Sequence, residues 1–168
     1  MKALIMSDTH GWTSQVKEIV ERHQDEVDVI LHCGDSELRA DDENLAGVYT
    51  VSGNCDFGND FPEEMVKEAK GYRFYVSHGH LLNVKMSEMN LVYKGEENEA
   101  HFVCFGHTHV PVAVEREGRI LINPGSVRLP RQVSVGTYVI LEAEENRKQV
   151  TFYSLDGEKQ ENLSKTFS

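Results

Sequence analysis

Seven residues of the types that bind divalent metals occur in five short strings within the first 109 positions. The strings are SDTHG, CGDSE, GNCD, SHGH and FGHTH, and each stands at or near the end of an apolar run. The seven candidate ligands are Asp8, His10, Asp35, Asn54, His78, His107 and His109. Carboxylate oxygen, amide oxygen and imidazole nitrogen together hold borderline divalent metals. Five such strings in order, each after a β-like run, predict a two-metal hydrolytic centre.

The apolar runs before these strings predict the strands of an α/β fold. Strands are expected at 2–6, 27–32, 48–52, 72–77 and 101–105, with weaker alternation at 64–69. Helical spacing predicts a first helix through Trp12, Val16, Ile19 and Val20, with Thr13 or Ser14 able to cap it. A second helix is expected through Met86, Met89, Leu91 and Val92.

After position 111 the sequence pattern changes to short apolar segments separated by turn residues, which predicts strands in antiparallel pairs. The expected strands are 112–116, 119–122, 135–142 and 149–155, with a hairpin turn at Glu117-Gly118 and a polar turn at 142–148. Residues from about 156 are polar and are expected to fray. The chain thus predicts one domain, 1–168, in which a mixed sheet with helices outside packs on a second, more antiparallel sheet.

The strand pattern also predicts that the candidate ligands converge. Parallel strands in α/β folds bring their carboxyl ends to a common edge, where ligands bind. Glycines beside the strings, such as Gly34 and Gly106, allow sharp turns and close backbone approach. Asp35 is the best candidate for a carboxylate shared between two metals, because it is the central acid of the series.

Size and charge exclude several classes of function. The 168 residues carry a net charge of −11, which argues against a broad nucleic-acid or anionic-membrane surface but not against a phosphate substrate held by cations. No apolar stretch approaches the roughly 20 residues of a membrane span. The start, MKALIMSDTH, is too short and too soon polar for a signal peptide, and three cysteines without a CxxC pair suit the cytoplasm.

Taken together, the strings resemble those of the calcineurin-like metallophosphoesterases, and among them the small phosphodiesterases of the YfcE type. The family pattern of Asp-x-His, Gly-Asp, Gly-Asn, a lone His and Gly-His-x-His is present in order, and the resemblance extends to 123–131. It implies a four-layer α/β/β/α sandwich of two mixed sheets flanked by helices. It also implies two divalent cations, with Mn favoured and Ni, Zn, Fe or Co as alternatives.

The resemblance assigns roles to the individual positions. It places one metal on Asp8, His10, Asp35 and His109, and a second on Asp35, Asn54, His78 and His107. It implies in-line attack on phosphorus by a hydroxide bridging the metals, with Asp35, Asn54 and His109 as the catalytic residues. Asn54 and His80 are the candidate substrate contacts, although His80 could instead simply pack beside His78.

One position departs from the larger family. Many members carry Gly-Asn-His, whose histidine protonates the leaving group, whereas this chain has Cys55 in that place. YfcE-type enzymes share this feature, so a good leaving group is expected to matter more. Asp56 could orient Asn54 or another ligand through a hydrogen bond.

Several residues have a structural reading beside a functional one. Arg128 and Arg131 could contact a phosphate or belong to a solvated loop. The turn at 123–126 is expected to support the site. Packing roles are expected for His32, Cys33 and Cys104, and surface positions for His23 and His101.

Three functions were compared on this basis. A phosphodiesterase acting on small diesters, as a monomer or as a homodimer or tetramer, agrees with every ligand position carrying a competent residue. A protein-interaction scaffold like the retromer subunit Vps29, with vestigial activity, is the alternative, although ligand positions are degenerate in such proteins. A nuclease is disfavoured by the net charge of −11 and the lack of a basic stripe.

Overall fold

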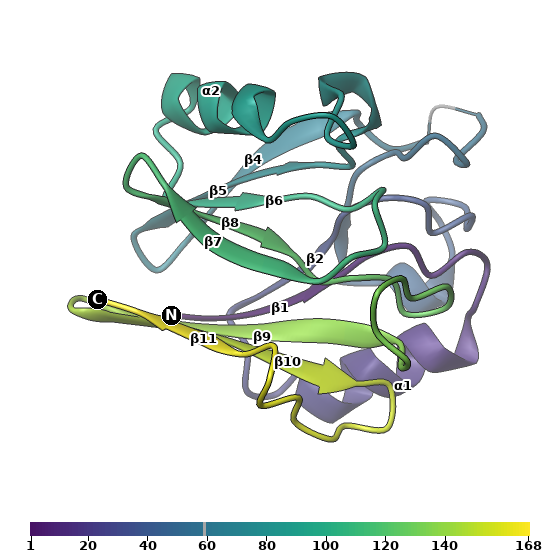
Figure 1. The fold of residues 1–168 in the computed structure, drawn as a ribbon. Coiled ribbons are helices and arrows are strands. Elements are labelled where there is room, and N and C mark those ends of the chain that lie inside the picture. Colours follow the sequence, from purple (N-terminus) through teal and green to yellow (C-terminus); the bar gives the residue numbers. More distant parts are fainter. Residues whose placement is uncertain (59) are drawn as a thin grey trace.

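The computed structural model describes residues 1–58 and 60–168 and has four layers. Two sheets face each other, with α1 (Ser14–His23) beneath the lower one and α2 (Met89–Glu97) above the upper one (Figure 1). The four-layer α/β/β/α sandwich implied by the resemblance is therefore confirmed. Two short 3-10 helices, η1 (Glu43–Leu45) and η2 (His80–Leu82), lie in the connecting loops.

The lower sheet has six strands in the order β11-β10-β9-β1-β2-β3. The strands are β1 (Lys2–Met6), β2 (Val29–His32), β3 (Tyr49–Thr50), β9 (Thr137–Glu144), β10 (Arg147–Ser154) and β11 (Lys165–Phe167). The first three run parallel, and β9 joins β1 in antiparallel register. This sheet therefore combines a parallel half from the start of the chain with an antiparallel half from its end.

The upper sheet has five strands in the order β4-β5-β6-β8-β7. The strands are β4 (Glu64–Ala69), β5 (Tyr72–Ser77), β6 (Phe102–Cys104), β7 (Val112–Arg116) and β8 (Arg119–Asn123). Strands β5, β6 and β8 are parallel, while β4 and β7 are antiparallel edges. Glu117 and Gly118 both have positive φ between β7 and β8, which confirms the predicted hairpin turn.

Alternating side chains on β1 show how the layers share one strand. Ala3 and Ile5 point into the core between the sheets, whereas Leu4 and Met6 point into the core beneath, against α1. A strand buried on both faces reads as a continuous apolar run, as this one does. A third cluster joins the upper sheet to α2. The three cores hold the loops at the strand ends in place.

The structure corrects four expectations from the sequence. The late strands do not form a separate antiparallel sheet, because β9 pairs with β1 and β8 pairs with β6. The residues after 155 are not simply frayed, since β11 pairs with β10. His23 is buried rather than on the surface, because its ring meets the Tyr138 hydroxyl at 2.7 Å. Met86 precedes α2 and is 79% exposed.

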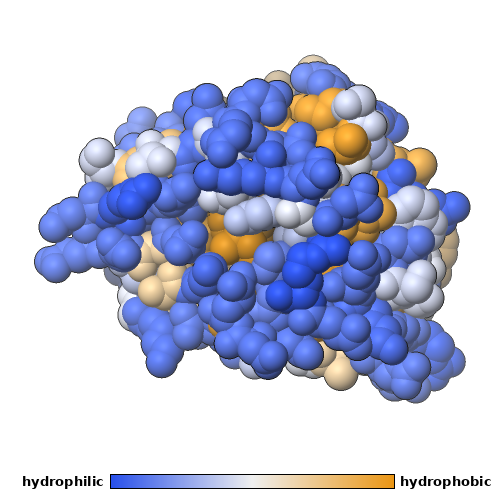
Figure 2. Space-filling model, turned by 90° about the horizontal axis from the view of Figure 1, so that it is seen from below, coloured by the Kyte–Doolittle hydropathy of each residue, from blue (hydrophilic) through white to orange (hydrophobic). Residues whose placement is uncertain are grey.

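The surface is polar over much of its area. Figure 2 views the side on which α1 and β10 lie, and hydrophilic side chains cover most of that face, with small separate apolar areas. Among the described residues, no helix combines the length and apolarity needed to cross a membrane.

Candidate metal centre

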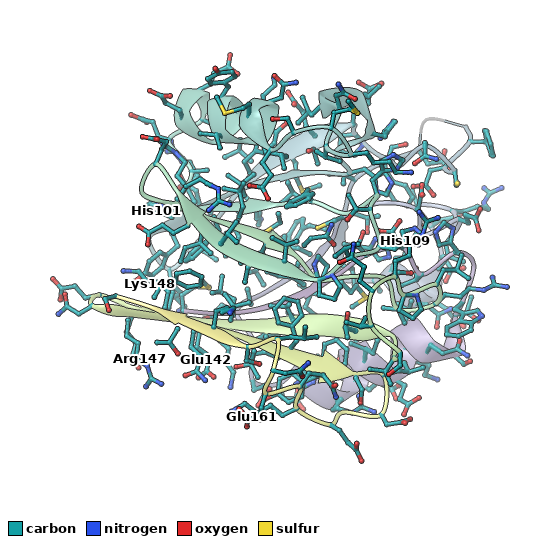
Figure 3. All side chains as sticks on the ribbon, in the orientation of Figure 1. His101, His109, Glu142, Arg147, Lys148 and Glu161 are labelled. Atoms are coloured by element: carbon teal, nitrogen blue, oxygen red, sulfur yellow. The ribbon has the colours of Figure 1, made fainter. Side chains whose placement is uncertain are left out.

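The loops that follow the parallel strands gather at one end of the two sheets. Figure 3 places His109 at this end, while His101 and Lys148 lie at the opposite end. The convergence predicted from the strand pattern is therefore observed, and it brings together ligand candidates from both sheets. The geometry divides into two halves that meet at the carboxylates of Asp8 and Asp35.

The first half of the site consists of Asp8, His10 and His109. Asp8 Oδ1 lies 3.1 Å from His109 Nε2 and 3.6 Å from His10 Nε2, and the two imidazole nitrogens are 3.4 Å apart. These three residues offer ligand atoms close enough together to hold one ion. His10 Nε2 also lies 4.0 Å from Asp35 Oδ2, which connects this half to the second.

The second half is built around His78. Its Nε2 lies 3.2 Å from Asp35 Oδ2, 3.0 Å from Asn54 Oδ1 and 3.8 Å from Asp8 Oδ1. The His107 ring packs edge-on at 5.1 Å from the His78 ring. All seven candidate ligands thus lie in one connected cluster, as the resemblance implies.

His80 borders this second half. Its ring centre is 5.3 Å from that of His78 and 6.1 Å from that of His107. Its Nδ1 is buried and has no hydrogen-bond partner among the described residues. The side chain therefore combines the packing role beside His78 with a polar atom that is still available.

Backbone carbonyls orient two of the imidazoles. The carbonyl oxygen of Cys33 lies 2.8 Å from His78 Nδ1, and that of Leu129 lies 2.8 Å from His109 Nδ1. A carbonyl can only accept, so both Nδ1 atoms carry a proton and donate it. In a neutral ring Nε2 then presents its lone pair to the centre of the site, which is how metal-binding histidines are held.

A cation fits this arrangement, because electron-pair donors face one another without protons between them. His78 Nε2 faces Asn54 Oδ1, and His109 Nε2 faces Asp8 Oδ1, at 3.0 and 3.1 Å. Asp8 Oδ1 is buried and has no hydrogen-bond partner among the described residues. Such groups require either protonated imidazoles or a bound cation. The mixed N and O donor set suits borderline divalent metals.

Electrostatics act differently on the carboxylates and on the imidazoles: the neighbouring Asp8 raises the pKa of His10, and the carboxylates of Asp35 and Asp8 outweigh burial and raise the pKa of His78. Burial alone would raise the pKa of Asp8, but its interactions with His10 and His109 outweigh burial and lower it. Burial would also raise the pKa of Asp35, but the interaction with His78 outweighs burial and lowers it. Burial, aided by the charge on His78, lowers the pKa of His107 to about 4. Both carboxylates are therefore ionised and His107 is neutral at pH 7.

Five of the seven ligand residues adopt a left-handed backbone conformation. Their φ angles lie between 42° and 69°, and they are Asp8, His10, Asp35, His107 and His109. Non-glycine residues in this region cost roughly 1–3 kcal/mol each and persist where the surroundings hold them. In Asp-x-His and His-x-His this conformation turns two candidate ligands, one residue apart, toward the same centre.

Two glycines allow the loops to approach the carboxylates. A Cβ on Gly53 would collide with Asp35 Oδ1, and a Cβ on Gly106 would collide with Ser7 Oγ and lie 2.6 Å from Asp8 Oδ2. Glycine is thus required at both positions by close contact. The Gly-Asn and Gly-His strings therefore combine a ligand with the small residue that lets it reach the site.

A supporting shell, only partly foreseen from the sequence, holds the carboxylates. Ser7 Oγ donates to Asp8 Oδ2 at 2.6 Å, and Ser126 Oγ donates to the Asp8 carbonyl at 2.8 Å. Asn123 donates to the Gly106 carbonyl at 3.0 Å, which agrees with the expected supporting turn at 123–126. Ser7 carried no distinctive signal, since a serine beside a ligand is common.

Asp56 supports the backbone rather than orienting Asn54. Its carboxylate accepts hydrogen bonds from the backbone N–H groups of Asp35, Glu37 and Gly53 at 2.7–2.8 Å. It thereby joins the Gly-Asp loop to the Gly-Asn loop. Of the two roles expected from the sequence, Asp56 thus holds another candidate ligand, Asp35, through that residue's backbone N–H, and it makes no hydrogen bond to Asn54 within the described residues.

Cys55 lies at the edge of the centre. Its backbone N–H donates to Asp35 Oδ1 at 2.8 Å, and burial followed by the Asp35 charge raises the pKa of its thiol to about 11. Such a thiol is a poor proton donor at neutral pH. A cavity of about 250 Å³ adjoins it, lined in part by Glu37, Phe57 and Phe61.

His32 lies behind the centre in the core. Gly34 N–H donates to its Nδ1 at 3.1 Å, so its Nε2 proton bonds Thr9 Oγ1 at 2.9 Å. Burial lowers the pKa of His32 to about 4. Cys33 and Cys104 are likewise buried, as expected, and His101 is exposed. His32 therefore lies behind the centre without belonging to it.

Comparisons with solved structures agree with this architecture. A crystal structure of a conserved Streptococcus pneumoniae TIGR4 protein, described as a predicted phosphoesterase, has a TM-score of 0.96 and 36% identity, and the match covers 99% of this chain and 97% of that one. Vps29 from Entamoeba histolytica complexed with Zn²⁺ has a TM-score of 0.75 and 21% identity, covering 99% and 98% of the two chains. At that identity, the likeness to Vps29 concerns the fold alone.

Sequence comparisons identify the family. A probable metallophosphoesterase of Bacillus subtilis, YsnB, is 41% identical over 163 residues, which cover 97% of this chain and 96% of that protein. Phosphodiesterase MJ0936 of Methanocaldococcus jannaschii is 31% identical over 144 residues, or 74% and 83% of the two chains. The profile of the calcineurin-like phosphoesterase superfamily domain matches residues 1–146. The chain therefore belongs to the calcineurin-like phosphoesterase superfamily.

Proposed function

We propose that this protein is a metal-dependent phosphodiesterase that hydrolyses small phosphate diesters with two divalent cations. The observation that carries the proposal is the convergence of two ionised carboxylates, an amide oxygen and four imidazoles on one centre. Lone pairs there face each other at 3.0–3.2 Å. This composition belongs to a centre that binds two cations rather than to a core or a protein-binding surface.

The ligands divide naturally between two ions that share Asp35. Asp8, His10, Asp35 and His109 would hold the first, and Asp35, Asn54, His78 and His107 the second. Asp35 is suited to the shared position because its Oδ2 lies 3.2 Å from His78 Nε2 and 4.0 Å from His10 Nε2. Bound cations of this kind supply Lewis acidity and an activated water at neutral pH, and Mn²⁺ is the ion proposed.

The chain's own residues then position the substrate. Asn54 is exposed and carries an amide N–H₂ group that can donate to a phosphoryl oxygen. His80, whose ring centre is 5.3 Å from that of His78, is the other proposed substrate contact. His109 is held by the Leu129 carbonyl, so its ring cannot rotate away from Asp8. These groups fix the phosphate rather than transfer protons to it.

A small diester is the proposed substrate. A net charge of −11 repels a long polyanion, whereas a single phosphate group meets the cations directly. The relationship to MJ0936, which is named a phosphodiesterase, supports diesters over monoesters. Cys55, with its thiol pKa near 11, provides no efficient acid for the leaving alcohol, so activated esters are expected to react fastest.

The test is hydrolysis of bis-p-nitrophenyl phosphate by chelator-stripped protein with Mn²⁺ added back. The Asp35→Asn variant is measured alongside, and Asp25→Asn, which alters an exposed carboxylate on the α1 side of the molecule, is the matched control. Mn²⁺ is expected to restore turnover in the wild type and in Asp25→Asn. Asp35→Asn is expected to show no turnover. Absence of turnover with Mn²⁺, Ni²⁺, Co²⁺ and Zn²⁺ would overturn the proposal in favour of a Vps29-like scaffold.

A further inference from the structure

We propose that Arg128 binds a non-bridging oxygen of the phosphoryl group, at the rim of the site beside Asp8, His10 and His109. This inference rests on the proposed phosphodiesterase function and deepens it by naming a side chain that recognises the phosphate. The sequence left Arg128 open between a phosphate contact and a solvated loop position. Its contacts in the structure favour the first reading.

The guanidinium of Arg128 is held against the first half of the centre. Its Nη1 donates to the carbonyl oxygen of His10, a residue whose side chain lies within the Asp8–His109 cluster. The same guanidinium lies 5.5 Å from the ring centre of half-buried Trp12, a cation–π distance. Two contacts of different kinds thus hold an exposed, otherwise flexible side chain in one place.

The loop that carries Arg128 is built around the same ligands. Ser126 Oγ bonds the Asp8 carbonyl, and the Leu129 carbonyl accepts from His109 Nδ1. The backbone N–H of Arg131 donates to the His109 carbonyl at 3.0 Å. The residues on either side of Arg128 therefore contact Asp8 and His109, which fixes the backbone of Arg128 beside the first half of the centre.

Most of the guanidinium's hydrogen-bonding capacity is unused. An arginine carries five N–H donors, and within the described residues Arg128 commits one of its nitrogens, Nη1, to a single acceptor. No carboxylate of the described chain lies within 4.0 Å of it, in contrast to Arg22 and Arg73. Arg119, Arg131 and Arg147 likewise have no ion pair among the described residues, but Arg128 differs from them in that its guanidinium is held beside His10. In a chain with 28 acidic residues, an unpaired guanidinium beside a phosphate site suits an external anion.

Inorganic phosphate, the smallest ligand with this chemistry, is the probe. Its binding to Mn²⁺-loaded protein is measured by calorimetry and as competitive inhibition of bis-p-nitrophenyl phosphate hydrolysis, in the wild type, Arg128→Gln and Arg128→Lys. Arg131→Gln is the matched control. Arg131 is an exposed arginine of the same loop, and its side chain makes no hydrogen bond or ion pair within the described part of the chain. Bound Mn²⁺ is quantified for every variant.

Arg128→Gln is expected to weaken phosphate binding about tenfold or more and to raise KM similarly, because a charge-assisted hydrogen bond is lost. The Mn²⁺ content of Arg128→Gln is expected to change less than threefold. Arg128→Lys is expected to restore part of the phosphate affinity, and Arg131→Gln to resemble the wild type. Unchanged phosphate affinity in Arg128→Gln would overturn the inference. Reduced Mn²⁺ content with unchanged phosphate affinity would instead show that Arg128 only holds His10 in position for the metal. If the wild type hydrolysed no ester, the proposed function itself would fail.

Discussion

Removal of divalent metal is expected to destabilise the folded protein strongly. Buried Asp8 Oδ1 has no hydrogen-bond partner within the part of the chain that the structure describes, and it faces His109 Nε2 at 3.1 Å. His78 Nε2 faces Asp35 Oδ2 at 3.2 Å in the same cluster. These groups do not converge in the unfolded chain, so a metal bound by the folded state shifts the folding equilibrium by mass action.

The magnitude follows from linkage. At a free metal concentration about 1,000 times the Kd, one site stabilises the folded state by about 4.1 kcal/mol. For a chain of 150–250 residues, each kcal/mol moves Tm by roughly 2–4 °C. One site alone therefore predicts a fall in Tm of roughly 8–16 °C when a chelator replaces Mn²⁺.

The assay is thermal unfolding, followed by circular dichroism, with Mn²⁺ or with EDTA. Asp8→Asn is expected to lose most of the Mn²⁺-dependent shift, taken as the difference between its own Tm with Mn²⁺ and in EDTA, because an amide is a weaker ligand for the cation than a carboxylate. Asp25→Asn should retain the full shift. An equal Mn²⁺ effect in Asp8→Asn and the wild type, or no effect in the wild type, would refute this account of the cluster.

Three other predictions concern residues around the centre. Burial lowers the pKa of His32 to about 4, whereas the same side chain in the unfolded chain is protonated near pH 6.5, so the free energy of unfolding should fall as the pH falls from 6.5 to 4. Urea titrations should show a smaller fall in His32→Gln, and an equal fall in both proteins would contradict the assigned pKa. Hydrolysis of phenyl phosphodiesters should be at least about 100-fold slower than that of p-nitrophenyl diesters, and Cys55→His should reduce this ratio of rates by supplying a general acid. An unchanged ratio in the variant would count against the role inferred for position 55. Ser126→Ala removes a buried hydrogen bond to the Asp8 carbonyl and should lower the free energy of unfolding in urea by about 1–3 kcal/mol. Ser134→Ala changes an exposed serine and should lower it little, and equal effects of the two substitutions would exclude a supporting role for Ser126.

Local patterns in the sequence predicted the ligands and most strands. A strand buried on both faces, such as Lys2–Met6, is an uninterrupted apolar run, and the ligand strings follow such runs directly. Asp-x-His and His-x-His bring both side chains to one centre through left-handed backbone, which is a property of a few adjacent residues. Nothing distant is needed to recognise either feature.

Long-range pairing could not be predicted in the same way. The antiparallel register of β9 on β1 joins residues such as Leu4 and Ile140, and no local signal states which sheet a late strand enters. The burial of His23 depends on Tyr138, 115 residues away. The short β11 was missed because its few polar residues look like a frayed end until β10 pairs with them.

The sequence by itself determined the candidate metal ligands and most of the strands that carry them, because ligand chemistry and strand periodicity are local properties. Only the tertiary structure decided how these residues are supported. It directs the carbonyls of Cys33 and Leu129 to His78 and His109, turns Asp56 toward the backbone of neighbouring loops, and places Arg128 on His10. Such contacts join positions tens of residues apart, so they exist only once the two sheets have packed together.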